Sequence, residues 1–89
     1  MQAKEAIAMA KKWVADLFEG EGVEGIRLEE VRFDDGPENW LITVGIERPR
    51  PSSPNIVDRL RPELRRSYKV VTLRDQTGEL VSVTNRPEE

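Results

Sequence analysis

The chain has 89 residues, which is enough for one small domain and too few for two ordinary ones. Apolar residues make up 37% and charged residues 35%, as in soluble, highly charged globular proteins. Cysteine and histidine are both absent, which removes disulfides, thiolate nucleophiles, the commonest general base and the commonest metal ligand. We therefore expect a protein that is not an enzyme and that has no catalytic residues, no cofactor and no metal site.

The net charge of −3 is unevenly distributed along the chain. Residues 1–47 hold 5 basic and 11 acidic side chains, whereas residues 48–66 hold 6 arginines against Asp58 and Glu63. A basic segment is thus inserted into an acidic domain. Charged residues between Lys4 and Lys12 interrupt the short apolar stretches near the N-terminus, so neither a signal-peptide core nor a membrane span is present. We expect a cytoplasmic protein with no membrane partner.

Residues 2–19 are predicted to form an amphipathic helix that ends at Gly20 and Gly22. Its apolar residues recur every three or four positions, the spacing of one helix face: Ala3, Ala6, Ile7, Ala10, Trp13, Val14, Leu17 and Phe18. We expect this stripe to be core, with Leu17 buried, and with Trp13 and Phe18 packed in the core instead of forming a ligand site.

Residues 26–33 have the composition of a β-strand in which the apolar alternation slips. Apolar side chains fall on one face up to Leu28 and on the other face from Val31 onward, so an extra residue at Glu29-Glu30 is predicted to form a β-bulge. Because adjacent strand residues point to opposite faces, we expect these two carboxylates to diverge.

A run of turn formers, residues 34–39, leads to a second strand, residues 40–47. Alternate apolar residues of this strand are predicted to face the helix: Trp40, Ile42, Val44 and Ile46. Gly45 lies on the opposite face, where it either allows a close approach or simply weakens the strand.

Residues 48–66 form a long insertion, rich in proline and arginine, between the second and third strands. Insertions of about twenty residues are unusual in so small a domain and often carry function. By elimination, this segment and nearby Tyr68 provide the candidate partner-binding residues: Arg48, Arg50, Arg59, Arg61, Arg65, Arg66 and Tyr68.

Several partners fit this segment. Arg48 to Pro54 matches the Arg-x-x-Pro-x-x-Pro pattern of polyproline ligands, and the arginines could also pair with the domain's own acidic face. The same arginines suit phosphate oxygens, but the acidic first half of the chain would repel a nucleic acid, so we favour a protein partner. A third hypothesis is self-association through an edge strand, giving a monomer or a weak homodimer.

The last stretch, residues 66–84, is predicted to be a β-hairpin. Two β-branched runs flank Asp75-Gln76-Thr77-Gly78, where Asp75 could bond the turn backbone and Gly78 could take the positive φ of a type I turn with a bulge. The whole chain is then an α+β domain, with one N-terminal helix packed on a four-stranded antiparallel meander in the order 1-2-3-4.

This hairpin resembles the last hairpin of PepSY domains, which runs as Tyr-x-Val, then Asp-x-x-Thr-Gly-Glu, then a Leu or Val run. Tyr68-Lys69-Val70 and residues 75–81 match that pattern, and the element order is similar, more loosely, to that of cystatin-like folds. The likeness implies a non-catalytic binding or regulatory domain. It brings no residue of known function, and the insertion at 48–66 departs from the PepSY plan.

Overall fold

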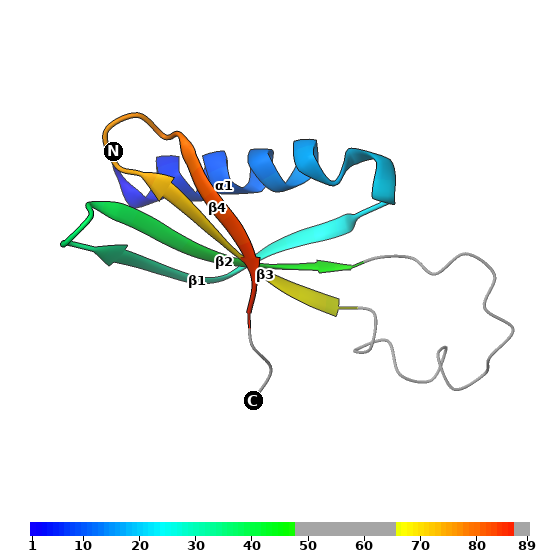
Figure 1. Cartoon of the computed structure of the whole chain (residues 1–89). Helices are drawn as coiled ribbons and strands as arrows, with labels where there is room; N and C mark the ends of the chain where they lie inside the picture. Colours follow the sequence, from blue (N-terminus) through cyan, green and yellow to red (C-terminus); the bar gives the residue numbers. More distant parts are fainter. Residues whose placement is uncertain (48–65, 87–89) are drawn as a thin grey trace, which may run out of the picture.

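The computed structural model describes residues 1–47 and 66–86, apart from the side chains of Glu24 and Arg66. One helix lies across one face of a four-stranded antiparallel sheet (Figure 1). The elements are α1 (Ala3–Leu17), the 3-10 turn η1 (Glu19–Glu21), β1 (Glu24–Asp34), β2 (Asn39–Glu47), β3 (Arg66–Arg74) and β4 (Leu80–Asn85). The strands are ordered β1-β2-β3-β4, so the predicted α+β meander is confirmed. No helix among the described residues is long and apolar enough to span a membrane.

Helix α1 is confirmed, although it ends at Leu17, two residues before the predicted range 2–19 does. The backbone N–H of Gln2 donates to Glu5 Oε1 at 3.3 Å, which satisfies one donor at the helix start. After Leu17 the chain tightens into η1 and then turns at Gly22, whose φ of 67° lies in the left-handed region that glycine tolerates. The chain can therefore reverse directly into β1.

The core lies between α1 and the two central strands. Ala6, Ala10 and Val14 follow one another at intervals of four along the helix and are fully buried. Their small size lets the helix backbone approach the sheet closely. The buried apolar residues of the sheet complete the core: Ile42, Val44, Ile46, Val71 and Leu73.

The prediction for Leu17 is wrong, because this side chain is 50% exposed. Helical spacing identifies the side of the helix on which a residue lies, but it does not say how far the sheet extends beneath it. Phe18, one residue beyond the helix, packs against the core, and so does Trp13 as predicted.

Strand β2 is central, and the predicted apolar face of this strand is confirmed. Ile42, Val44 and Ile46 are fully buried beneath α1, and Trp40 packs at the margin of the core. Five consecutive residues, 42–46, are buried, and on the other face of β2 the side chains of Glu29 and Tyr68 lie over Gly45.

The predicted bulge in β1 is confirmed. Leu28 lies opposite Val44 and Glu30 lies opposite Thr43, so Glu29 is the extra residue. This insertion resets the alternation and returns Val31 to the helix side, opposite Ile42.

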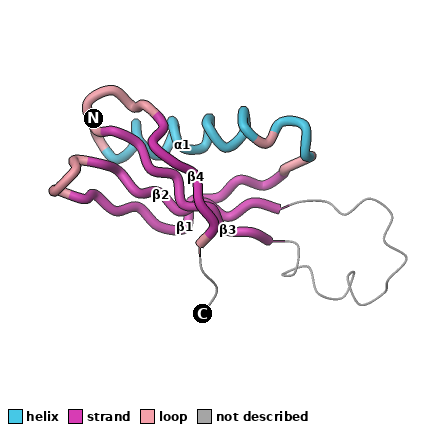
Figure 2. The backbone as a smooth tube through the Cα atoms, viewed as in Figure 1, coloured by secondary structure: helices cyan, strands magenta, loops and turns pink. Residues whose placement is uncertain are grey.

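The two ends of the sheet differ (Figure 2). At one end, which we call the turn end, the β1–β2 turn and the β3–β4 turn lie beside the start of α1, and the N–H of Asp75 donates to the carbonyl of Glu38 at 3.0 Å. At the other end, the segment end, Glu47 pairs with Glu24 and with Arg66. Residues 48–65 therefore connect two adjacent, paired positions.

Candidate interaction surfaces

Most of the sequence-predicted binding residues lie outside the described residues: Arg48, Arg50, Arg59, Arg61 and Arg65. Arg66 is the first residue of β3 and pairs with Glu47. Tyr68 follows two residues later in the same strand and is half-buried. Of the predicted binding residues, Tyr68 is thus the one whose side chain the structure describes.

Tyr68 lies on the sheet face opposite α1, which we call the open face. It pairs directly with Gly45, and its Cε1 is 3.4 Å from the position that a Cβ on Gly45 would take. The Oε2 atom of Glu29 is 3.3 Å from that same position. Gly45 therefore allows a close approach, and the aromatic ring covers a strand glycine, an arrangement that helps to stabilise sheets.

Glu29 and Glu30 lie on the same face, contrary to our expectation. Glu29 reaches Gly45 on the open face, and Glu30 lies opposite Thr43, which points to that face as well. The bulge is the cause, because a bulged residue does not obey the two-residue alternation. Both carboxylates are exposed, and exposed Arg27 and Arg32 flank them along β1.

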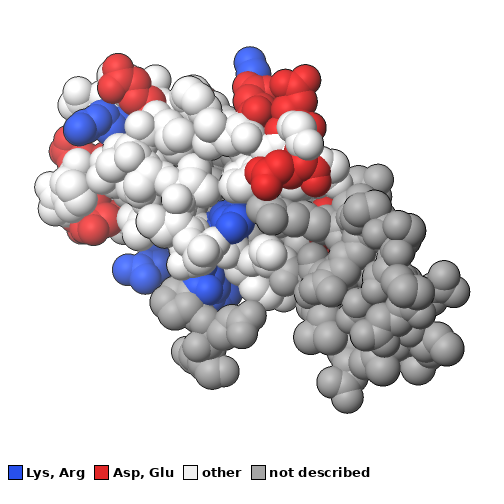
Figure 3. Space-filling view, turned by 45° about the vertical axis from the view of Figure 1, so that its right-hand side comes forward, with Lys and Arg blue, Asp and Glu red and all other residues white. Residues whose placement is uncertain are grey.

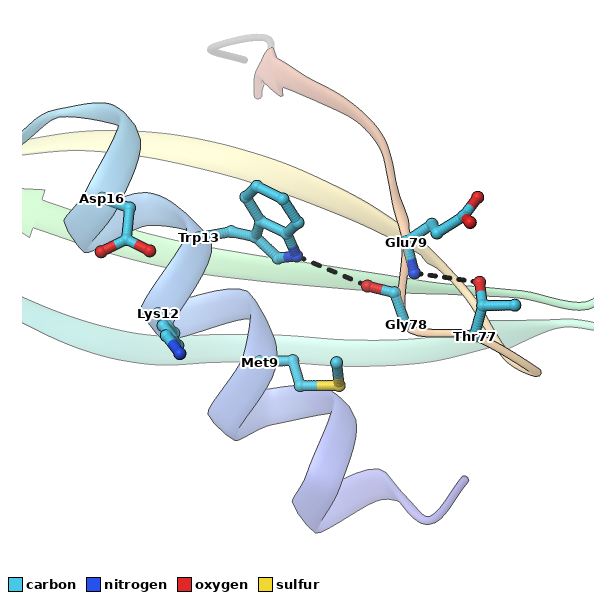
Figure 4. Close-up of a pocket in the computed structure, with 7 residues that line it drawn as sticks. All are labelled: Met9, Lys12, Trp13, Asp16, Thr77, Gly78 and Glu79. Carbon is cyan, nitrogen blue, oxygen red and sulfur yellow. Dashed lines mark hydrogen bonds between the residues drawn. The ribbon is translucent and has the colours of Figure 1, made fainter.

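A groove of about 360 Å³ lies between α1 and the β3–β4 turn (Figure 4). Its lining residues are Met9, Lys12, Trp13, Asp16, Thr77, Gly78 and Glu79. Met9 and the Trp13 ring make its apolar part, and Lys12, Asp16 and Glu79 bring charges to it. A groove of this size with an apolar strip and charged margins suits a single apolar side chain or a small apolar ligand.

Two features favour glycine at position 78. Its φ is 74°, and a Cβ at this position would lie 2.2 Å from Met9 Cε and 2.7 Å from Met9 Sδ, so the flexible end of Met9 would have to move. The Trp13 indole N–H donates to the Gly78 carbonyl at 3.4 Å. The turn and the helix are therefore in direct contact through this glycine.

The turn itself is wider than a type I turn, since the N–H of Gly78 donates to the carbonyl of Arg74, four residues earlier, at 2.8 Å. Thr77 Oγ1 accepts the N–H of Glu79 at 3.1 Å. The extra residue of the hairpin falls later, at Val81, between the pairs Thr72–Ser82 and Leu73–Leu80.

Asp75 bonds other elements through its side chain. Its Oδ1 accepts the Trp40 indole N–H at 2.7 Å and the Met1 amine at 3.0 Å. The hydrogen bond from Trp40 and the bond and charge of the amine lower the pKa of the Asp75 carboxyl, whereas desolvation opposes this shift. Asp75 thus joins β2, the start of α1 and the β3–β4 turn.

Acidic side chains gather near the segment end. Asp16, Glu19 and Glu21 follow one another where α1 ends, and Figure 3 shows acidic surface over this part of the molecule. The last turn of α1 contains no basic residue, although positive charge is the favourable choice at a helix C-terminus. The domain therefore presents negative charge near the positions from which the basic segment departs.

Sequence reasoning placed Trp13 in the core and missed its role in the groove. The indole N–H of Trp13 was the available clue, since a tryptophan at the margin of a core usually needs a hydrogen-bond acceptor for this group. Its partner, Gly78, lies 65 residues away, and periodicity cannot find such a pair.

In residues 1–47 and 66–86, no group of three or more Asp, Glu, His or Cys side chains could hold a metal ion. Comparison of the chain with models of protein families, with curated proteins and with solved structures found no match.

Proposed function

We propose that this protein is a non-catalytic interaction module that binds an acidic protein partner through residues 48–66. The observation that carries the proposal is the charge contrast: 6 arginines against two acidic residues in this segment, within a chain of net charge −3. Arginine is well suited to carboxylates, because its planar fork donates two parallel hydrogen bonds.

The fold supports this proposal at both ends of the segment. Glu47 and Arg66 are paired on the two central strands, so the segment starts and finishes at adjacent positions of the sheet. A binding segment anchored on rigid strands keeps its two ends at a fixed separation. The PepSY-like hairpin of β3 and β4 supports a regulatory role, and that resemblance stays a prediction.

A capture experiment with charge-matched variants tests the proposal. One variant changes Arg48, Arg50, Arg59 and Arg61 to Gln, and the control changes the same number of exposed basic residues elsewhere: Lys4, Lys12, Arg74 and Arg86 to Gln. Both variants lose the same charge. We expect the first variant to lose the proteins captured from a nuclease-treated lysate, and the control to retain them.

Identical sets of captured proteins for the wild type and both variants would contradict the proposal. Capture that disappears after nuclease treatment would instead favour the nucleic-acid alternative, which should also weaken steeply with added salt.

A further inference from the structure

Strand β1 is an edge strand of the sheet. It runs for 11 residues and, within residues 1–47 and 66–86, pairs only with β2, whereas β4, at the other edge, has 6 residues. Residues 27–30 and 32–34 of β1 are exposed. Edge strands present unpaired N–H and C=O groups, and proteins usually shorten or cover them. The outer side of β1 is visible in Figure 2.

Two large apolar side chains are exposed on this same strand. Leu28 is 38% exposed and Phe33 is 42% exposed. Both lie on the helix side of the sheet, because Leu28 pairs with Val44 and Phe33 pairs with Trp40. The Phe33 ring packs on Trp40 with a centroid distance of 5.0 Å, which holds it in place at the edge.

From Arg27 onward, the charged residues of β1 lie on the open face and alternate in sign along the strand. Arg27 comes first, then the bulged pair Glu29-Glu30, then Arg32 and then Asp34. Between them, Val31 returns to the helix side opposite Ile42. The strand therefore has one apolar face and one face with mixed charge.

We propose that two copies of this chain associate through β1, antiparallel, about a two-fold axis that passes beside Val31. The sheet then continues from one copy into the other, with both α1 helices on the same face. Val31 lies opposite Val31 of the second copy, and Phe33 lies opposite Leu28. On the open face, Arg32 lies opposite the bulged pair and Asp34 lies opposite Arg27.

This register is favoured over its neighbours by face and by charge. A slip of one position would set apolar residues opposite charged ones on the wrong face. A slip of two positions keeps the faces but opposes like charges: Arg27 against Arg32 in one direction, or Arg32 against itself in the other. Directly opposed like charges destabilise paired strands. Because the occupant is a second copy, this inference does not depend on residues 48–66.

Cross-linking tests the position of the axis. The chain lacks cysteine, so Val31→Cys introduces a single thiol. Opposed residues of antiparallel strands have Cα atoms about 4.5–5.5 Å apart, which is within the range of a disulfide. We expect mild oxidation to convert folded Val31→Cys into a covalent dimer. Val81→Cys is the matched control, since Val81 is a valine of the other edge strand that is 45% exposed.

A charge exchange tests the register without a covalent bond. Arg32→Glu makes the facing groups all acidic, and the double variant Glu29→Arg with Glu30→Arg makes them all basic. We expect each variant alone to dimerise roughly tenfold more weakly than the wild type, and an equimolar mixture of the two to form a heterodimer. Recovery in the mixture excludes misfolding as the cause of the loss.

Sedimentation of the wild type as a strict monomer at concentrations up to about 1 mM would overturn the proposal. So would cross-linking of Val31→Cys no faster than that of Val81→Cys, or a mixture of the charge variants that stays monomeric.

Discussion

The turn end and the segment end of this domain are stabilised in different ways. At the turn end, two indole N–H groups and a carboxylate join elements that are distant in sequence, through Trp13–Gly78 and Trp40–Asp75. At the segment end, Leu17 is 50% exposed, and Lys69 lies 5.5 Å from the centre of the Phe18 ring. The turn end is closed by directional hydrogen bonds, whereas at the segment end a cation lies over an aromatic ring.

The contacts that specify how the helix sits on the sheet are therefore best defined at the turn end. Hydrogen bonds and the left-handed φ of Gly78 restrict this end to one arrangement. At the segment end, residues 48–65 join β2 to β3, and Phe18 packs against the core. The following variants test this difference between the two ends.

The largest effect is expected for Gly78→Ala. The left-handed φ and the overlap with Met9 should together cost about 2–4 kcal/mol. Gly20→Ala is the control at the other end of α1, because a Cβ there meets nothing within 4 Å. Urea denaturation of both variants measures the two costs. Equal urea midpoints for the two variants would show that position 78 tolerates a Cβ as well as position 20 in η1 does.

A smaller effect is expected along α1 itself. Val14 is fully buried, so Val14→Ala should lose about 2–3 kcal/mol, since two buried methyl groups leave a cavity. Leu17→Ala should lose less than about 1 kcal/mol, because this side chain is half exposed. Thermal melts would decide. A larger loss for Leu17→Ala would place that residue against the core after all.

The Asp75 carboxylate should make stability sensitive to acid. Its pKa is lowered in the folded state, so its contribution is complete above the unfolded value of about 3.9 and is lost as the pH falls through the lower native value. We expect the wild type to be more stable than Asp75→Asn near neutral pH, and this advantage to shrink below about pH 4.

Trp40→Phe provides the second variant for this test, because it keeps a ring in place but removes the N–H that bonds Asp75. In Trp40→Phe, the stability lost in acid should be smaller than in the wild type, although the Asp75 carboxylate is still present. Urea midpoints measured across the acid range would refute the idea if all three proteins lost stability in parallel.

The smallest effect is a gain in stability. Glu38 has a φ of 56°, which is unfavourable for a residue with a side chain, and its carbonyl accepts the Asp75 N–H. Glu38→Gly should stabilise the fold by about 0.5–1 kcal/mol because that strain is relieved. Glu38→Ala keeps the strain and should show no gain by the same denaturation measurement.

Much of the fold could be predicted because its signals are local. The spacing of Ala6, Ala10 and Val14, the alternation along β2 and the glycine of the β3–β4 turn are patterns of a few residues, and all three match the structure. The phase slip in β1 even located the bulge at Glu29. Local geometry restricts these choices before any tertiary contact forms.

The interaction surfaces could not be predicted in the same way. The groove depends on Met9 and Trp13 meeting a turn that is distant in sequence, and the direction of Glu29 depends on how the bulge is accommodated against Gly45. Asp75 was expected to bond its own turn, but Trp40 and the Met1 amine are close enough in space to take its carboxylate. Each outcome depends on a contact between residues that are far apart in the sequence.

The element order, the apolar faces and the position of the bulge follow from the amino-acid sequence alone, because backbone sterics and side-chain periodicity act over short distances. The exposure of Leu17, the bonds of Asp75 to other elements and the approach of Glu29 to Gly45 could be read only from the folded structure. Burial and pairing are set by what lies across the sheet, and twist and packing decide that only when the chain folds.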